Sequence, residues 1–245
     1  MPYELYTDKI HKFNSLKEIP AEIYANTTDF DAIAMKLVNI SDIGLKCPKL
    51  ERLNLSCNNI KKLNLTYFPN LKKIQCSNNN ISEIIGFENC YKLEEANFEL
   101  NYLKSIESNH NLKTLYIAKN NLDELPSFNN LEILDCRKNK LLKKIGECPN
   151  MKHLLISNTR IRNIDFYKNL IQLECSNTLI KELHPYPKLK TLEYKNTLIK
   201  KLPYLPSLEL DDEVDDEVDD EFYFAENSGY ITLFNKKTME KVEHT

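Results

Sequence analysis

The chain of 245 residues contains no tryptophan and only 4 glycines. Phosphate-binding loops need glycines at fixed spacing, and neither these motifs nor a nucleophile elbow occurs. The 5 histidines show no paired spacing of the H-E-x-x-H kind, so a zinc site of that type is excluded. We therefore expect no enzymatic activity, no catalytic residue, no metal ligand and no cofactor.

Long apolar runs are also missing. No segment approaches the roughly 18 apolar residues of a membrane span, and the charged start MPYELYTDKIHKFNSLKEIP lacks the apolar core of a secretory signal. The 7 cysteines are odd in number and form no C-x-x-C pair, which favours reduced thiols. The sequence predicts a cytoplasmic monomer without membrane association, with the nucleus as an alternative location.

Asparagine, in contrast, is abundant, with 29 residues, and much of it belongs to a repeat. The template is L-x-x-L-x-L-x-x-N-x-L-x-x-L, whose places we number as repeat positions 1 to 14. Copies of it follow one another every 19 to 22 residues. They begin at Leu50, Leu71, Leu93, Leu112, Leu131, Met151, Leu170 and Leu189.

This repeat resembles that of the leucine-rich repeat superfamily, of the short intracellular type, over roughly residues 30–210. The resemblance implies a right-handed solenoid, of the α/β-type class but mostly β, with a parallel sheet on its concave side. The alternation in x-L-x-L-x agrees, because successive side chains of a strand point to opposite faces. About eight residues per repeat remain for the convex side, too few for a full helix, so we expect extended or 3₁₀ segments there.

Repeat position 9 follows the strand, where an asparagine amide can bond the N–H and C=O groups that a bend leaves unpaired. A threonine hydroxyl can make some of these hydrogen bonds in its place. The predicted ladder consists of Asn58, Asn79, Asn101, Asn120, Asn139, Thr159, Thr178 and Thr197. Cys76, Cys136 and Cys175 occupy position 6 and are expected to be buried.

Four segments are predicted. Residues 1–29 form an N-terminal cap with a degenerate half repeat, and residues 30–210 form the solenoid of about nine repeats. Residues 211–221 read DDEVDDEVDDE, a self-repelling acidic linker. In residues 222–245 turn-forming residues separate two aromatic, β-branched runs, which predicts a β-hairpin and tail. The open end of the solenoid is one candidate surface for this hairpin to pack on, and another protein is the alternative.

The residues at positions 3, 5 and 7 of each repeat are expected to face solvent on the concave sheet. Among them, three large apolar side chains fall on neighbouring strands beside an arginine, which is the composition of an interface anchor. The predicted protein-binding residues are Tyr116, Ile133, Asp135, Arg137, His153 and Leu155. We interpret the chain as a non-enzymatic protein–protein interaction module.

Two alternatives remain open at this point. Residues 45–208 carry 26 basic and 16 acidic residues, and repeats followed by an acidic run also resemble acidic nuclear leucine-rich phosphoproteins, which suggests a nucleic-acid-associated or nuclear regulator. Lysine pairs such as Lys61-Lys62 are expected along one rim, however, while the concave columns carry glutamates, so nucleic-acid binding is not favoured. The other alternative is a regulatory or inhibitory subunit of an enzyme.

Overall fold

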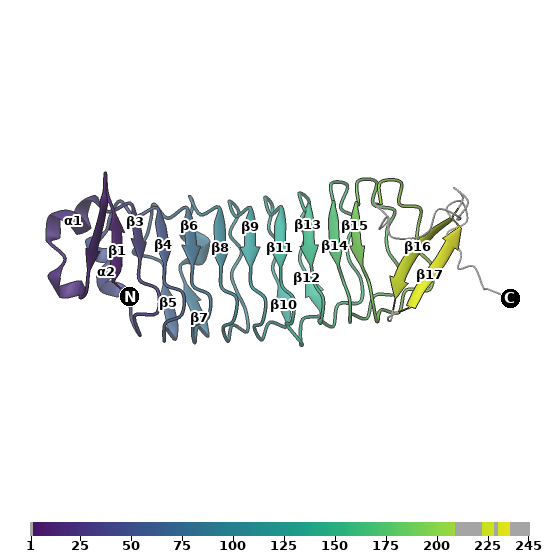
Figure 1. Cartoon of the computed structure of the whole chain (residues 1–245), viewed down its shortest axis with the longest axis horizontal. Coiled ribbons are helices and arrows are strands. Elements are labelled where there is room, and N and C mark those ends of the chain that lie inside the picture. The colour runs from purple at the N-terminus through teal and green to yellow at the C-terminus, as the bar shows by residue number, and fades with distance from the viewer. Residues whose placement is uncertain (1, 209–221, 228–229, 236–245) are drawn as a thin grey trace.

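A computed structural model describes residues 2–208, 222–227 and 230–235. The repeats form coils that stack along one long axis, each with a short strand on the same side (Figure 1). The strands of the eight repeats are β4 (Arg52–Asn54), β6 (Lys73–Gln75), β8 (Glu95–Asn97), β9 (Thr114–Tyr116), β11 (Ile133–Asp135), β13 (His153–Leu155), β14 (Gln172–Glu174) and β15 (Thr191–Glu193).

These eight strands and three from the N-terminal end make a single 11-stranded sheet, in the order β15-β14-β13-β11-β9-β8-β6-β4-β3-β1-β2. Its strands from β3 (Asp29–Asp31) to β15 are parallel, and repeat positions pair without a shift, as in Leu53 with Ile74. The structure therefore confirms the predicted leucine-rich repeat solenoid with one parallel sheet.

The opposite side of each coil is extended or 3₁₀, as expected. It contains β5 (Lys62–Asn64), β7 (Glu83–Ile85), β10 (Glu124–Leu125), β12 (Lys144–Ile145) and the 3₁₀ turn η2 (Phe87–Asn89). The strands pair in parallel as β5 with β7 and β10 with β12. Two small second sheets thus form where consecutive coils remain extended at the same place.

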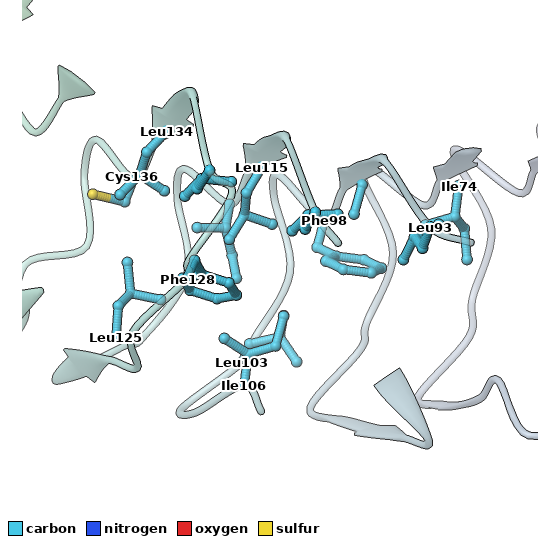
Figure 2. Packing of buried hydrophobic residues seen from close by; sticks show 14 of the residues in the cluster. Ile74, Leu93, Phe98, Leu103, Ile106, Leu115, Leu125, Phe128, Leu134 and Cys136 are labelled. Carbon is cyan, nitrogen blue, oxygen red and sulfur yellow. The ribbon is translucent and has the colours of Figure 1, made fainter. Parts of the chain in front are cut away.

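The core lies between these two sides. Leu115 and Leu134 reach down from the sheet toward Leu103, Ile106 and Phe128 on the far side of the coils (Figure 2). All five are buried, and full burial of a side chain of this kind contributes roughly 1.5–3 kcal/mol. The inward placement predicted for the three cysteines at position 6 is confirmed, since none of them is exposed to solvent.

One backbone feature recurs in every repeat. The residue at position 8, just before the ladder position, has a positive φ between 55° and 62°. The set is Cys57, Asn78, Leu100, Lys119, Lys138, Asn158, Asn177 and Asn196. This left-handed residue turns the chain out of the strand, and asparagine tolerates it best among non-glycine residues.

The N-terminal end is built differently. A hairpin of β1 (Tyr3–Tyr6) and β2 (Ile10–Phe13) is followed by the 3₁₀ turn η1 (Leu16–Glu18), α1 (Ala21–Asn26) and, after β3, α2 (Ser41–Lys46). Strand β1 pairs antiparallel with β3. Its inward residues Tyr3 and Leu5 are buried, and the Tyr3 ring lies 6.3 Å from that of Phe30.

At the other end, β16 (Phe222–Asn227) and β17 (Tyr230–Asn235) pair antiparallel as a separate two-stranded sheet. Figure 1 shows this hairpin beyond β15. The predicted acidic linker, residues 211–221, lies outside the described residues.

Candidate functional site

The candidate site is the solvent-facing side of the 11-stranded sheet around β9, β11 and β13. The middle residue of each of these strands is buried, while the residues that flank it face outward. Asp135 pairs in register with Tyr116 on one side and Leu155 on the other, and Ile133 pairs with Thr114 and His153. The sheet thus brings all five predicted strand residues onto three adjacent strands.

The three apolar side chains of this group are half-buried. Tyr116 and Leu155 lie two strands apart in one column, and Ile133 lies diagonally between them on β11. Such diagonal neighbours are about 7–8 Å apart. They form a small apolar surface, which we call the β9–β13 patch: Tyr116, Ile133 and Leu155.

Arg137 is held at one side of this patch, across Leu155, by two carboxylates. Its Nε donates to Asp135 Oδ1 at 3.0 Å and its Nη2 donates to Asp135 Oδ2 at 2.7 Å. Its Nη1 reaches Glu174 Oε2 on β14 at 2.8 Å. Because Leu155 stands between Asp135 and Glu174 in the column, the guanidinium bridges from one side of this leucine to the other. Bidentate arginine–carboxylate pairs of this kind fix geometry.

Burial accompanies this arrangement. Asp135 is only 7% exposed, and the Glu174 side chain is 13% exposed. Desolvation raises the pKa of Glu174, and the neighbouring Arg137 charge acts in the opposite direction. Hydrogen bonding to Asp135 raises the pKa of Arg137, which therefore remains charged. Asp135, Arg137 and Glu174 form one fixed unit, which we call the Arg137 brace.

Glu174 is the residue that the sequence prediction left out of the site. Its position 5 in the repeat is shared with Asp135, but the two are far apart in the chain and separated by a strand. The network continues beyond it: Gln172 Nε2 donates to Glu174 Oε1 at 2.9 Å, and Gln172 Oε1 lies 3.2 Å from His153 Nδ1. His153, a predicted site residue, thus lies at the far end of the same network.

The remainder of the sheet face toward the N-terminus has a different character. Ion pairs there join adjacent coils, such as Lys73 with Glu95 at 2.9 Å and Lys119 with Glu99 at 2.9 Å. Gln75 also donates to Glu95 at 3.0 Å. Both of these lysines are paired with glutamates, so the described part of this face offers no continuous basic track for phosphates. Lys62, expected on a rim, lies on β5 at the opposite side of the coil, where it pairs with Glu83 at 2.7 Å.

The position 9 side chains lie inside the coils, one beside the next. Asn120 shows the pattern: its Nδ2 donates to the carbonyls of Phe98 and Ile117 at 2.9 and 3.1 Å, and its Oδ1 accepts from the N–H of Leu103 at 2.9 Å. Asn58, Asn79, Asn101 and Asn139 are buried and bond both their own coil and the preceding one in this way.

The threonines at this position bond less. The Thr159 hydroxyl donates to Ile156 O at 2.8 Å, and that of Thr178 donates to Cys175 O at 2.7 Å, both within their own coil. The Thr197 hydroxyl accepts from the N–H of Ile199 at 3.4 Å. The amide ladder across coils thus belongs to the first five repeats.

A second row of asparagines, just before position 1, was not predicted. Its members donate through Nδ2 to a carbonyl of the preceding coil at 2.6 to 2.9 Å. They are Asn70, Asn111, Asn130 and Asn150, bonded to Pro48, Tyr91, His110 and Asn129. The signal was present, since an asparagine or lysine precedes position 1 in all eight repeats, but its partners lie about 20 residues back.

Two features are absent from the part of the chain that the structure describes. Among the described residues, no group of three or more histidine, cysteine, aspartate or glutamate side chains is placed to hold a metal ion. Within the same part of the chain, no helix has the length and apolar character needed to span a membrane.

Known proteins are similar to this chain in sequence and in fold. Residues 49–71 match the family model described as Leucine Rich Repeat. The structure is similar to YopM from Yersinia enterocolitica WA-314, with a TM-score of 0.60 and 25% identity over 66% of this chain and 37% of YopM. No curated protein matches the sequence.

Two further structures share the fold. The leucine-rich repeat domain of APL1B gives a TM-score of 0.58 at 18% identity, over 65% of this chain and 53% of that one. The functional domain of InlJ from Listeria monocytogenes gives 0.54 at 20% identity, over 78% and 45%. The chain therefore spans between 37% and 53% of the lengths of these three structures.

Proposed function

Because the chain is a leucine-rich repeat protein, we propose that it binds a partner protein on the solvent-facing side of its sheet, at the β9–β13 patch. The fold is commonly a protein–protein interaction module. Its members are generally non-enzymatic, and we propose the same for this chain. The 7 cysteines are free thiols, which supports a reducing, cytoplasmic environment.

The observation that carries this proposal is the Arg137 brace over the apolar patch. A partner that binds a surface fixed in advance loses less entropy on association. Here the side chains around Leu155 are already held by hydrogen bonds of 2.7 to 3.0 Å. Tyrosine and arginine at the centre of an apolar surface are the residues that most often carry binding energy.

The charges around the patch favour a protein over a nucleic acid. Arg137 is already paired with Asp135 and Glu174, and Glu193 follows Glu174 in the same column. A phosphate backbone approaching this surface would meet carboxylates, whereas nucleic-acid binders present a continuous basic groove.

The test is an affinity capture from host lysate, with bound proteins identified by mass spectrometry. The variant is the triple substitution Tyr116→Asp, Ile133→Asp and Leu155→Asp, which places three charges on the patch. We expect it to lose the partner that the wild-type protein captures, because buried apolar contacts carry most interface energy.

The matched control adds three charges to the other part of the same face, with Asn54→Asp, Ser77→Asp and Asn97→Asp. It is expected to retain the partner, and circular dichroism checks that both variants fold. If the patch variant captured the same proteins as the control, binding at the β9–β13 patch would be contradicted. Binding to nucleic acid, with affinity falling steeply as salt rises, would favour the nuclear-regulator alternative.

The regulatory-subunit alternative uses the same surface and differs only in the partner. If the captured protein is an enzyme, its activity is measured with the wild-type chain and with the patch variant. A change in activity with the wild type alone would identify the chain as a regulator or inhibitor of that enzyme.

A further inference from the structure

Strand β15 is the last strand of the large sheet, and its coil lacks the neighbour that every earlier coil has. Its middle residue, Leu192, is only partly buried, whereas the equivalent residues of the seven preceding repeat strands are buried. The flanking Thr191 and Glu193 are exposed. The last strand is therefore less covered at Leu192 than its equivalents are, although Tyr194 and Leu202 of the same coil are buried.

Backbone hydrogen bonding shows the same gap. In the first seven repeats, the N–H at position 6 donates to the position 5 carbonyl of the following coil, at 2.7 to 2.9 Å. Cys175, the seventh, donates to Glu193 O at 2.7 Å. Tyr194 is the eighth, and its N–H has no such partner among the described residues. Its hydroxyl group is buried there without a hydrogen bond. A buried hydroxyl group without a partner is unfavourable.

The chain does not continue the repeat beyond this point. Counting from Leu208 as position 1, Asp211 and Glu213 take the places of the inward residues at positions 4 and 6. Carboxylates are almost never buried without a partner. The sequence therefore predicts no further coil of the same kind after Leu208.

The opposite end of the same molecule is covered by a hairpin. There β1 pairs antiparallel with β3, and Tyr3 and Leu5 are buried over the first coil. The chain offers a second hairpin, β16–β17, on the far side of β15. An isolated two-stranded hairpin is marginally stable in water. The hairpin therefore needs a surface to pack on, and among the described residues the β15 end of the sheet lacks a covering strand.

We propose that the β16–β17 hairpin is the cap of this end, docking on β15 over Leu192 and supplying the acceptor for the Tyr194 N–H. The 13 residues from 209 to 221 span up to about 40 Å, which is ample for this return. Charge favours it as well: residues 209–235 carry 11 acidic residues and no lysine or arginine, whereas residues 170–208 carry 6 lysines and 3 acidic residues.

The register of the hairpin indicates which face docks. Phe224 pairs with Leu233, and Tyr223 pairs with Phe234, so the two pairs belong to opposite faces. The alternate positions in register with Phe224 and Leu233 are Phe222, Ile231, Glu226 and Asn235. The other alternate positions are Tyr223, Phe234, Ala225, Thr232, Asn227 and Tyr230. We assign the first set, which has four large apolar residues, to the solenoid; its one acidic residue, Glu226, lies at the turn end of the hairpin.

Hydrogen exchange of the Tyr194 amide in the full chain tests this assignment. The double variant Phe224→Asp, Leu233→Asp is expected to speed this exchange at least about tenfold over wild type, because the covering strand is lost. The matched double variant Tyr223→Asp, Phe234→Asp, altered on the opposite face, is expected to exchange as the wild type does. Amides of β9 and β11 report that the solenoid itself remains folded.

Equal Tyr194 exchange in the wild type and both double variants would overturn the proposal. So would protection that increases with protein concentration, since that would make a second copy of the chain the occupant of β15. Faster exchange in the opposite-face variant alone would overturn the assignment of the docking face.

Discussion

Asparagine at position 9 is the residue that ties coil to coil. The Asn120 amide satisfies two carbonyls at 2.9 and 3.1 Å and one N–H at 2.9 Å, all within the core. We expect Asn120→Ala to lower the free energy of unfolding by about 2–4 kcal/mol, because it leaves these buried groups without partners. Urea denaturation followed by circular dichroism measures this loss.

The chain itself supplies the control for this prediction. Thr159 and Thr178 occupy the same position and keep a bond to their own coil. Asn120→Thr is therefore expected to cost clearly less than Asn120→Ala. Equal losses for the two would show that packing volume, and not hydrogen bonding, fixes this position.

The Arg137 brace gives a pH-dependent prediction at the same scale. Burial raises the pKa of Glu174 above 4.5, and Arg137 counteracts this rise. In Arg137→Met the pKa of Glu174 rises further. A carboxyl whose folded-state pKa is raised costs stability above that pKa and costs none below its unfolded value. The free energy of unfolding of the variant is thus expected to be about 1–2 kcal/mol lower than that of the wild type at pH 7. This difference shrinks as the pH falls through the raised pKa toward 4.5.

Thermal unfolding of the variant and wild type across this pH range is the measurement. Arg160→Met is the control, since the Arg160 side chain is exposed and makes no ion pair among the described residues. It is expected to change stability little at any pH. A deficit for Arg137→Met that stays constant with pH would contradict the coupling to Glu174.

At the scale of the element, the small sheet of β10 and β12 depends on close backbone approach. Gly146 follows β12, and its N–H donates to Leu125 O at 2.8 Å. A Cβ at this place would lie 2.5 Å from the Pro126 carbonyl carbon and 2.8 Å from Ser127 Cα. Because these are backbone atoms of the preceding coil, no side-chain movement relieves the contact.

Gly146→Ala is therefore expected to lower the free energy of unfolding by about 1–3 kcal/mol. Glu147→Ala, the next residue along the chain and exposed, is the matched control and should stay within about 0.5 kcal/mol of wild type. Chemical denaturation compares the two. Equal midpoints would mean that the coils separate at this edge without cost.

Much of the element scale could be predicted from the sequence. Positions 1, 4, 6 and 9 recur so regularly that strand, inward face and turn follow from them. The second asparagine row and the Arg137 brace could not, for a physical reason. Asn111 bonds Tyr91 and Arg137 bonds Glu174, at separations of 20 and 37 residues, and such contacts follow only once the exact coil length and side-chain reach are known. The hairpin cap at β1–β2 likewise has no repeat signature.

At the scale of the whole molecule, each coil packs its buried side chains against its neighbours, so a substitution in the core has an effect that depends on where its coil lies. Leu115 is fully buried between two coils, while Leu192 in the last strand is partly buried. We expect Leu115→Ala to lower the free energy of unfolding by about 3–5 kcal/mol and Leu192→Ala to lower it by about 1–2 kcal/mol. In Leu115→Ala, amide hydrogen exchange is expected to become faster in the coils on both sides of the substitution. In Leu192→Ala it is expected to become faster only at the end of the stack.

The two substitutions serve as controls for each other. Equal losses, or uniform loosening of every coil in both, would mean that the stack unfolds as a single cooperative block and not through neighbour-to-neighbour contacts.

The parallel sheet and both asparagine rows join consecutive coils through hydrogen bonds directed along the long axis. A tensile load applied between the two ends would therefore pull along these bonds. It would break one coil interface at a time instead of shearing all of them together. The chain should extend under load in a regular series of steps, each releasing one coil of 19 to 22 residues, or about 70 Å of contour. The mechanical resistance of the molecule is therefore divided evenly among its coil interfaces.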